Sequence, residues 1–139
     1  MKIRARVDNF AGRHAVTVST SDRARELPIA PKAEGPGSSV NGGELLCLAL
    51  ATCYCNDLYR EAGKRGIEIH RVEVEAEAVF GAEGAPAERL SYHARVSART
   101  SRQVLIDLMR HTDTVAEIQN TLRRACPVVL SGVEALEAS

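Results

Sequence analysis

Alternating apolar and polar residues at the start of the chain predict a β-hairpin. Residues 3–7 alternate apolar with basic side chains, and residues 16–18 resume the alternation after turn residues that include Gly12. A period of two residues is typical of a strand with one buried face. A third strand is expected over residues 26–29, where Pro28 would restrict it to the edge of a sheet.

A second alternating pair lies in the middle of the chain. Residues 72–80 alternate apolar side chains with glutamates, and residues 90–98 alternate them with serine, histidine and arginine. Residues 81–86 join the two runs, which predicts an antiparallel hairpin with one dry face. On the other face we expect solvated cross-strand ion pairs rather than a site.

Between the two hairpins, a nearly continuous apolar run predicts a long helix over residues 43–65. Asn41 or the neighbouring glycines can cap its start. The first half is apolar almost all round, so it must be buried on more than one side. The pattern turns amphipathic from Asp57 onward. We therefore expect the first half to be core and the second half to emerge.

The last third of the chain predicts two shorter helices. One covers residues 101–111 with Ser101 as its N-cap, and the other covers residues 114–125 with a cap at 112–113. Residues 128–130 are predicted to form a short buried strand.

Composition limits the classes of function. The 139 residues fit one domain, 1–139, and the 18 basic and 18 acidic residues cancel to a net charge of zero. This balance gives no basic surface for nucleic acid or for an anionic membrane. The N-terminus lacks a signal-peptide core, and no apolar run is long enough to span a membrane. We expect a cytoplasmic protein whose cysteines are thiols.

The four cysteines are Cys47, Cys53, Cys55 and Cys126. At 3.6 residues per turn, Cys53 and Cys55 point to opposite sides of the predicted helix. No clustered histidine or second cysteine pair completes a ligand set, so we predict no metal and no cofactor. Cys47 and Cys55 are interpreted as small buried hydrophobic residues.

Cys53 differs from them in its neighbours. Asp57 and Arg60 lie one and two turns further along the same stripe of the helix, where the apolar run meets charged residues. A thiol in that place can be partly exposed at the bottom of a cleft. Cys126 stands beside Pro127 at a helix end. From the residues alone, two ordinary buried thiols remain the alternative.

The stretch from Gly42 to Cys53 resembles the helix motif of the OsmC/Ohr family, in which a small-residue run ends in a reactive cysteine. The continuation over residues 62–67 and the Cys126-Pro127-Val128 motif match as well. The order of elements fits the family over nearly the whole chain. The resemblance implies an OsmC-like α+β fold and an intertwined homodimer with two sites at its interface.

The resemblance also implies a chemistry. Cys53 would be the peroxidatic thiolate, and Cys126 would resolve its sulfenic acid to a disulfide that an external dithiol reduces. Family members activate the thiolate with an arginine from the N-terminal strands and a glutamate before the helix. Arg13 is the candidate arginine here, with Arg23 and Arg25 as competitors.

The candidate glutamate is Glu44, because Gly43 stands where the family's glutamate is usual. Arg13 and Glu44 also have ordinary alternatives, a solvated turn arginine and a first-turn helix carboxylate.

Two functions follow from the resemblance. The first is a thiol-dependent peroxidase that reduces organic hydroperoxides or hydrogen peroxide. The alternative is a non-catalytic OsmC-like dimer that binds a small apolar or acyl ligand in the interface cleft. The departures at Gly43 and after Pro127 keep the alternative open.

Overall fold

The computed structural model describes residues 1–138 as a mixture of helices and antiparallel strands, which confirms the predicted α+β class. The chain divides into two compact units, one from Met1 to Leu48 and one that begins at Ala49. Each unit is described by itself below, and the assignment of all 139 residues to one domain stays a prediction. No helix among the described residues is long and apolar enough to cross a membrane.

The first unit contains a three-stranded antiparallel sheet in the order β1-β2-β3. Its strands are β1 (Ile3–Phe10), β2 (Arg13–Thr20) and β3 (Arg23–Glu26). Ala11 and Gly12 connect β1 to β2 at φ values of 47° and 73°, which suits the twist of a two-residue hairpin turn.

The third strand lies a few residues earlier than the pattern at 26–29 predicted. β3 pairs with β2 directly after a turn in which Ser21 has a φ of 53°. This tight turn places Arg23 directly opposite Thr20, so the pairing between β2 and β3 starts at Arg23 and ends at Glu26, before Pro28. Arg23 and Arg25 therefore belong to a strand and not to a loop.

The long helix α1 (Gly42–Lys64) agrees with the prediction to within one residue at each end. Asn41 caps it reciprocally with Glu44. The Glu44 N–H donates to Asn41 Oδ1 at 2.8 Å, and the Asn41 N–H donates to Glu44 Oε1 at 3.0 Å. This capping box satisfies two backbone donors that the first turn of a helix otherwise leaves free.

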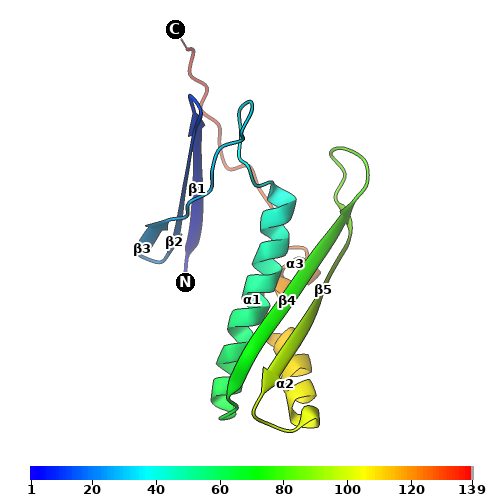
Figure 1. Cartoon of the computed structure of the whole chain (residues 1–139). Coiled ribbons are helices and arrows are strands. Elements are labelled where there is room, and N and C mark those ends of the chain that lie inside the picture. Colours follow the sequence, from blue (N-terminus) through cyan, green and yellow to red (C-terminus); the bar gives the residue numbers. More distant parts are fainter. Residues whose placement is uncertain (139) are drawn as a thin grey trace. The chain divides into compact units, whose positions relative to one another are not determined.

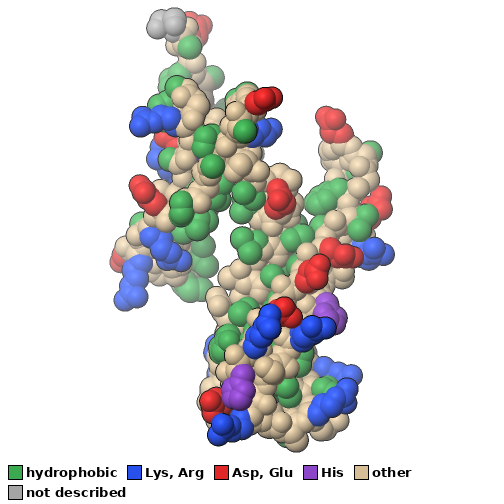
Figure 2. All heavy atoms as spheres, viewed as in Figure 1, with side chains coloured by type: hydrophobic (Ala, Val, Ile, Leu, Met, Phe, Trp, Pro, Cys, Tyr) green, Lys and Arg blue, Asp and Glu red, His purple; other side chains and the backbone are tan. Residues whose placement is uncertain are grey.

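The second unit packs α1, from Ala49 onward, and α2 against one face of a hairpin (Figure 1). Its elements are β4 (Ile69–Phe80), β5 (Ala87–Ala98), α2 (Arg102–Val115) and α3 (Glu117–Arg123). In the hairpin, Val72 pairs with Val96 and Val74 with Ala94, so one face is apolar as predicted. The charged side chains of the other face are visible in Figure 2.

The core of this unit is a small cluster in which Leu58 of α1 and Leu108 of α2 are fully buried. Tyr54 and Ala62 of α1 complete the cluster. The Tyr54 hydroxyl donates to the Met109 carbonyl at 2.8 Å, so this buried polar group is satisfied.

The prediction that the first half of α1 is core and the second half emerges is wrong for the single chain. Leu48 is 58% exposed, whereas Leu58 is 0% exposed. The reason is tertiary, because the hairpin and α2 pack against the second half of the helix.

The boundary between the last two helices also differs from the prediction. Ser101 is the N-cap of α2, as expected, and accepts a hydrogen bond from the Val104 N–H. Thr112, however, does not cap a new helix. Its hydroxyl donates to the Leu108 carbonyl at 2.8 Å inside α2, which runs on to Val115.

The predicted buried strand at residues 128–130 is wrong as well. The Val128 side chain is 99% exposed, and the segment has no strand partner among residues 1–138. A strand needs a neighbouring backbone for its hydrogen bonds, and a short apolar run does not supply one.

Truncating Leu58 should show how much this buried cluster contributes to the free energy of unfolding. We expect Leu58→Ala to lower the free energy of unfolding by about 2–5 kcal/mol, because the substitution opens a cavity at a fully buried position. Chemical denaturation measures the change. Leu136→Ala, at a position that is 91% exposed, is the matched control and should change it by less than about 0.5 kcal/mol. Equal losses in both variants would contradict this account of the core.

Candidate functional site

Cys53 lies in the middle of α1, half-buried, one turn before Asp57. The Cys53 thiol donates to Asp57 Oδ2 at 3.3 Å. Asp57 is itself buried, with 7% of its surface exposed. The helix therefore places a thiol and a carboxylate in contact inside the protein.

The start of α3 closes over the same sulfur. The Ile118 N–H donates to Cys53 Sγ at 3.5 Å, and Glu117 Oε2 lies 3.9 Å from it. These residues follow Cys53 by more than sixty positions in the chain. Next to them, the Gln119 amide donates to the Leu50 carbonyl at 3.0 Å. The beginning of α3 is thus fixed against α1 around Cys53.

Arg60 joins the two carboxylates beside the thiol. Its Nη1 lies 3.0 Å from Asp57 Oδ1 and 2.9 Å from Glu117 Oε1. Its Nη2 donates to the Val115 carbonyl at 3.3 Å, at the end of α2. The guanidinium group therefore neutralises the carboxylates, and its hydrogen bonds go to oxygens and not to the sulfur.

The surroundings of Cys53 favour the neutral thiol. Burial raises the pKa of Cys53, and the hydrogen bond to Asp57 together with the charges of Asp57 and Glu117 raises it further. The Ile118 N–H acts in the opposite direction, because it stabilises the thiolate. A cation directed at the sulfur would be needed to reverse this balance.

The pKa values of Asp57 and Glu117 are shifted in opposite directions. Burial raises the pKa of Asp57, and the neighbouring carboxylate of Glu117 raises it further. The interaction with Asp57 lowers the pKa of the more exposed Glu117. Asp57 is therefore the member of the pair that takes up a proton more readily.

One group of potential metal ligands is found among residues 1–138. The ligand atoms of Cys53, Asp57 and Glu117 all lie within 4.8 Å of one another. Arg60 already supplies the positive charge between the two carboxylates. The arrangement is thus a thiol beside an arginine-bridged carboxylate pair.

The other cysteines lie apart from this network. All four cysteines are free thiols; Cys47 and Cys55 are half-buried on α1, and Cys126 is exposed. Cys126 follows the end of α3, and its thiol contacts the Pro127 carbonyl. No disulfide or hydrogen bond within the described residues links it to Cys53, so the resolving role of Cys126 stays a prediction.

Arg13 and Glu44 belong to the first unit. Arg13 is the exposed first residue of β2, and Glu44 is engaged in the capping box with Asn41. The helix-cap alternative for Glu44 is therefore what the single chain shows. A role for either residue at Cys53 stays a prediction.

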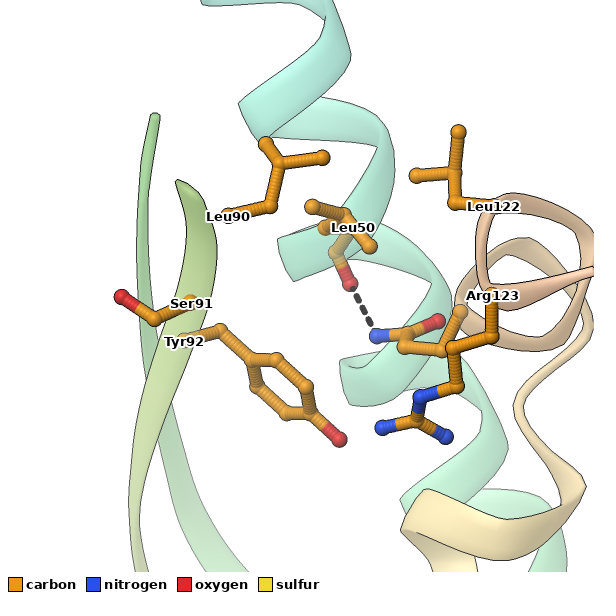
Figure 3. A pocket seen from close by; sticks show the side chains of 7 residues that line it. Leu50, Leu90, Ser91, Tyr92, Leu122 and Arg123 are labelled. Carbon is orange, nitrogen blue, oxygen red and sulfur yellow. Dashed lines mark hydrogen bonds between the residues drawn. The ribbon is translucent and has the colours of Figure 1, made fainter. Parts of the chain in front are cut away.

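A pocket of about 190 Å³ lies beside the contact between α1 and α3 (Figure 3). It is lined by Leu50, Leu90, Ser91, Tyr92, Gln119, Leu122 and Arg123. Three leucines give it a largely apolar wall. Arg123 and the Tyr92 hydroxyl are both bound to Asp113, so its polar groups are mostly satisfied by the chain itself.

Comparison with known proteins identifies the family. The model of the OsmC-like protein family matches residues 35–131, which is well over half of the chain. This chain belongs to the OsmC-like protein family. Among curated protein sequences, none matches it significantly.

Solved structures of OsmC-like proteins share its fold. An OsmC-like protein from Mycoplasma pneumoniae has a TM-score of 0.60 and 16% identity, over 88% of this chain and 86% of its own. An organic hydroperoxide resistance protein OsmC from Legionella pneumophila has a TM-score of 0.56 and 18% identity, over 86% and 89%. One from Elizabethkingia anophelis has a TM-score of 0.57 and 18% identity, over 86% and 88%. At these identities the likeness shows the fold alone.

The sequence predicts those neighbours of Cys53 that lie on its own helix. The helical stripe from Cys53 through Asp57 to Arg60 is visible in the spacing, and the structure confirms that these three residues interact as neighbours. Glu117 and Ile118 were missed. Their contact joins segments far apart in sequence, and no local pattern signals it.

Glu61 anchors the charged end of the network. Its buried carboxylate accepts hydrogen bonds from Arg60 and Lys64, both at 2.9 Å, and lies 3.1 Å from His111 Nε2. The bonds from Lys64 and Arg60 lower the pKa of Glu61 to about 2. The ionised carboxylate therefore stabilises the folded state.

We expect Glu61→Gln to lower the Tm at neutral pH because the charge-assisted bonds are lost. A depressed folded-state pKa gives stability that is present above the ordinary value of 4.5 and is lost as the pH falls towards about 2. The Tm difference between wild type and variant should therefore shrink over that range in thermal melts. Glu83→Gln, in an exposed turn, is the control. A difference that stays constant down to the acid end would contradict the assignment.

Proposed function

We propose that this OsmC-like protein is a thiol-dependent peroxidase that reduces organic hydroperoxides or hydrogen peroxide. The Cys53 sulfur attacks the O–O bond and keeps one oxygen as a sulfenic acid, and the peroxide leaves as an alcohol or water. The Cys126 thiol then condenses with the sulfenic acid, releasing water and forming a disulfide. An external dithiol reduces that disulfide by exchange.

The observation that carries the proposal is the placement of Cys53. It stands at the end of the small-residue motif of the OsmC-like family, half-buried, and it is the one cysteine set within a network of acidic and basic groups. Structural neighbours are named organic hydroperoxide resistance proteins, which supports the direction of the proposal.

Activation of the thiol needs a cation, since burial and two carboxylates raise its pKa. Arg13 is our candidate, with Glu44 to orient it, as the family resemblance implies. Arg23 and Arg25 are the alternatives, now placed on β3. The Ile118 N–H contributes a smaller stabilisation of the thiolate from within the second unit.

We also infer that the protein acts as a homodimer in the cytoplasm, without nucleic acid or membrane as partner. The sheet of the first unit presents an apolar face on β1, where Ile3 is 66% and Val7 is 62% exposed (Figure 2). Leu48 on α1 is exposed as well. An apolar face of this kind is normally covered, and a second copy of the chain is the partner that the family resemblance implies.

Replacement of Cys53 should abolish the reaction. We expect Cys53→Ser to consume no peroxide in the presence of a dithiol, because no sulfur remains to attack. Cys55→Ser, a half-buried cysteine two residues away, is the matched control and should keep the activity. Intact mass spectrometry after peroxide treatment should show a loss of about two hydrogens in the wild type. In Cys126→Ser, the sulfenic acid should persist as an added oxygen instead.

A wild type that is inert over a range of hydroperoxides and dithiols would contradict the peroxidase and favour the binding protein. The pocket lined by Leu50, Leu90 and Leu122 lies within the second unit and not in a known interface cleft, but its apolar wall supports binding of a small apolar ligand. A small apolar or acyl ligand should then protect the protein against thermal unfolding, with no change in its mass.

The dimer has its own test. Charges placed on the apolar face of β1, in Ile3→Lys with Val7→Lys, should shift the wild-type dimer to a monomer in sedimentation velocity, because lysine is costly to bury in an interface. Arg4→Glu with Arg6→Glu, which changes the opposite face of the same strand, is the control. A wild-type protein that sediments as a monomer would contradict the inference.

A further inference from the structure

Reduction of a peroxide by a thiol requires the transfer of a proton from the thiol to the departing oxygen. The Cys53 thiol must lose its proton before or during attack, and the departing alkoxide must gain one. Within residues 1–138, two carboxylates lie within hydrogen-bond distance of the Cys53 sulfur, and the shorter contact is with Asp57 Oδ2 at 3.3 Å. The Glu117 carboxylate lies farther away, at 3.9 Å.

The structure holds Asp57 in one orientation. Its other oxygen, Oδ1, is fixed by Arg60 at 3.0 Å, and the residue is buried on α1. Arg60 is anchored in turn by Glu117 on α3 and by the Val115 carbonyl at the end of α2. Oδ2 is thereby turned towards the sulfur and needs no rearrangement to accept its proton.

We propose that Asp57 is a catalytic residue that takes the proton from Cys53 through Oδ2 and delivers it to the departing oxygen of the peroxide. Arg60 is its positioning residue. This inference rests on the proposed peroxidase function and extends it, because it assigns the proton to a residue outside the Arg13–Glu44 pair.

The step balances. The thiol proton passes to Asp57 as the sulfur bonds to the distal oxygen of the hydroperoxide, which keeps its own hydrogen. The O–O bond breaks, the sulfur loses two electrons, and the proximal oxygen gains them. That oxygen leaves as an alcohol with the proton from Asp57, so the carboxylate is regenerated and Cys53 is a sulfenic acid.

Two features of the site support this role. Burial raises the pKa of Asp57, so the carboxyl group can hold a proton closer to neutral pH than an exposed aspartate can. The negative charge of the neighbouring Glu117 carboxylate favours the same protonated form. The carboxylate pair that keeps the resting thiol protonated is thus also suited to receive its proton.

The test separates proton transfer from thiol ionisation by changing the leaving group. In single-turnover kinetics, Asp57→Asn should slow the reaction with tert-butyl hydroperoxide about 100-fold, the usual contribution of a positioned acid or base. The reaction with peracetic acid should be much less affected, because its leaving group is a weakly basic carboxylate that needs no proton. Alkylation by iodoacetamide, whose leaving group is iodide, should be unchanged or faster.

Two further variants distinguish loss of proton transfer from misfolding of the site. Asp57→Glu should restore part of the rate with tert-butyl hydroperoxide, and Asp107→Asn, an exposed aspartate on α2, should react like wild type. Because Cys126 is exposed and also reacts with iodoacetamide, alkylation is followed at Cys53 by peptide mapping. Retained alkylation of Cys53 in Asp57→Asn shows that the thiol remains accessible in a folded site.

Each outcome bears on the proposal. Equal losses with both peroxides and with iodoacetamide would mean that Asp57 delivers no proton to the leaving oxygen, and would overturn the proposal. A rate of Asp57→Asn equal to wild type with tert-butyl hydroperoxide would overturn it as well and leave the peroxidase intact. A wild type inert to both peroxides but reactive with iodoacetamide would overturn the proposed function and this inference together.

Discussion

The arginine that bridges Asp57 and Glu117 is the interaction on which the site depends. Arg60 binds a carboxylate of its own helix, a carboxylate at the start of α3 and a backbone carbonyl at the end of α2. Arg60 and Glu117 are partly exposed, so the ion pair between them contributes little to stability. Their effect is geometric, because together they hold the start of α3 against the sulfur of Cys53.

The surroundings of Cys53 have two opposite effects on the reactivity of its thiol. A thiolate is the better nucleophile, yet burial and two carboxylates favour the thiol. A carboxylate in contact with a thiol raises its pKa but is also placed to receive its proton. In the reaction that we propose, the cost in ionisation and the gain in proton transfer arise from the same hydrogen bond between Cys53 and Asp57.

The main buried cluster lies in the second unit, while large apolar side chains are exposed elsewhere in the chain. Leu58 and Leu108 are fully buried between α1, α2 and the hairpin. Ile3, Val7 and Leu48 are exposed although the pattern around them is typical of core. Apolar area removed from water drives association as it drives folding, and for that reason we propose these residues as the contact surface of the homodimer.

The sequence by itself determined the elements whose signals are local. The period of two residues located both hairpins, the apolar run located α1, and Asn41 and Ser101 were recognisable caps. It also placed Asp57 and Arg60 on the stripe of Cys53, because helical spacing is fixed by backbone geometry. Tertiary structure decided what local signals cannot reach. Packing of the hairpin and α2 decides which half of α1 is buried. The Thr112 hydroxyl bonds to a carbonyl within α2, and the apolar residues 128–130 have no strand partner among residues 1–138. Glu117 contacts Cys53 because the chain, beyond the hairpin and α2, returns to the surface of α1.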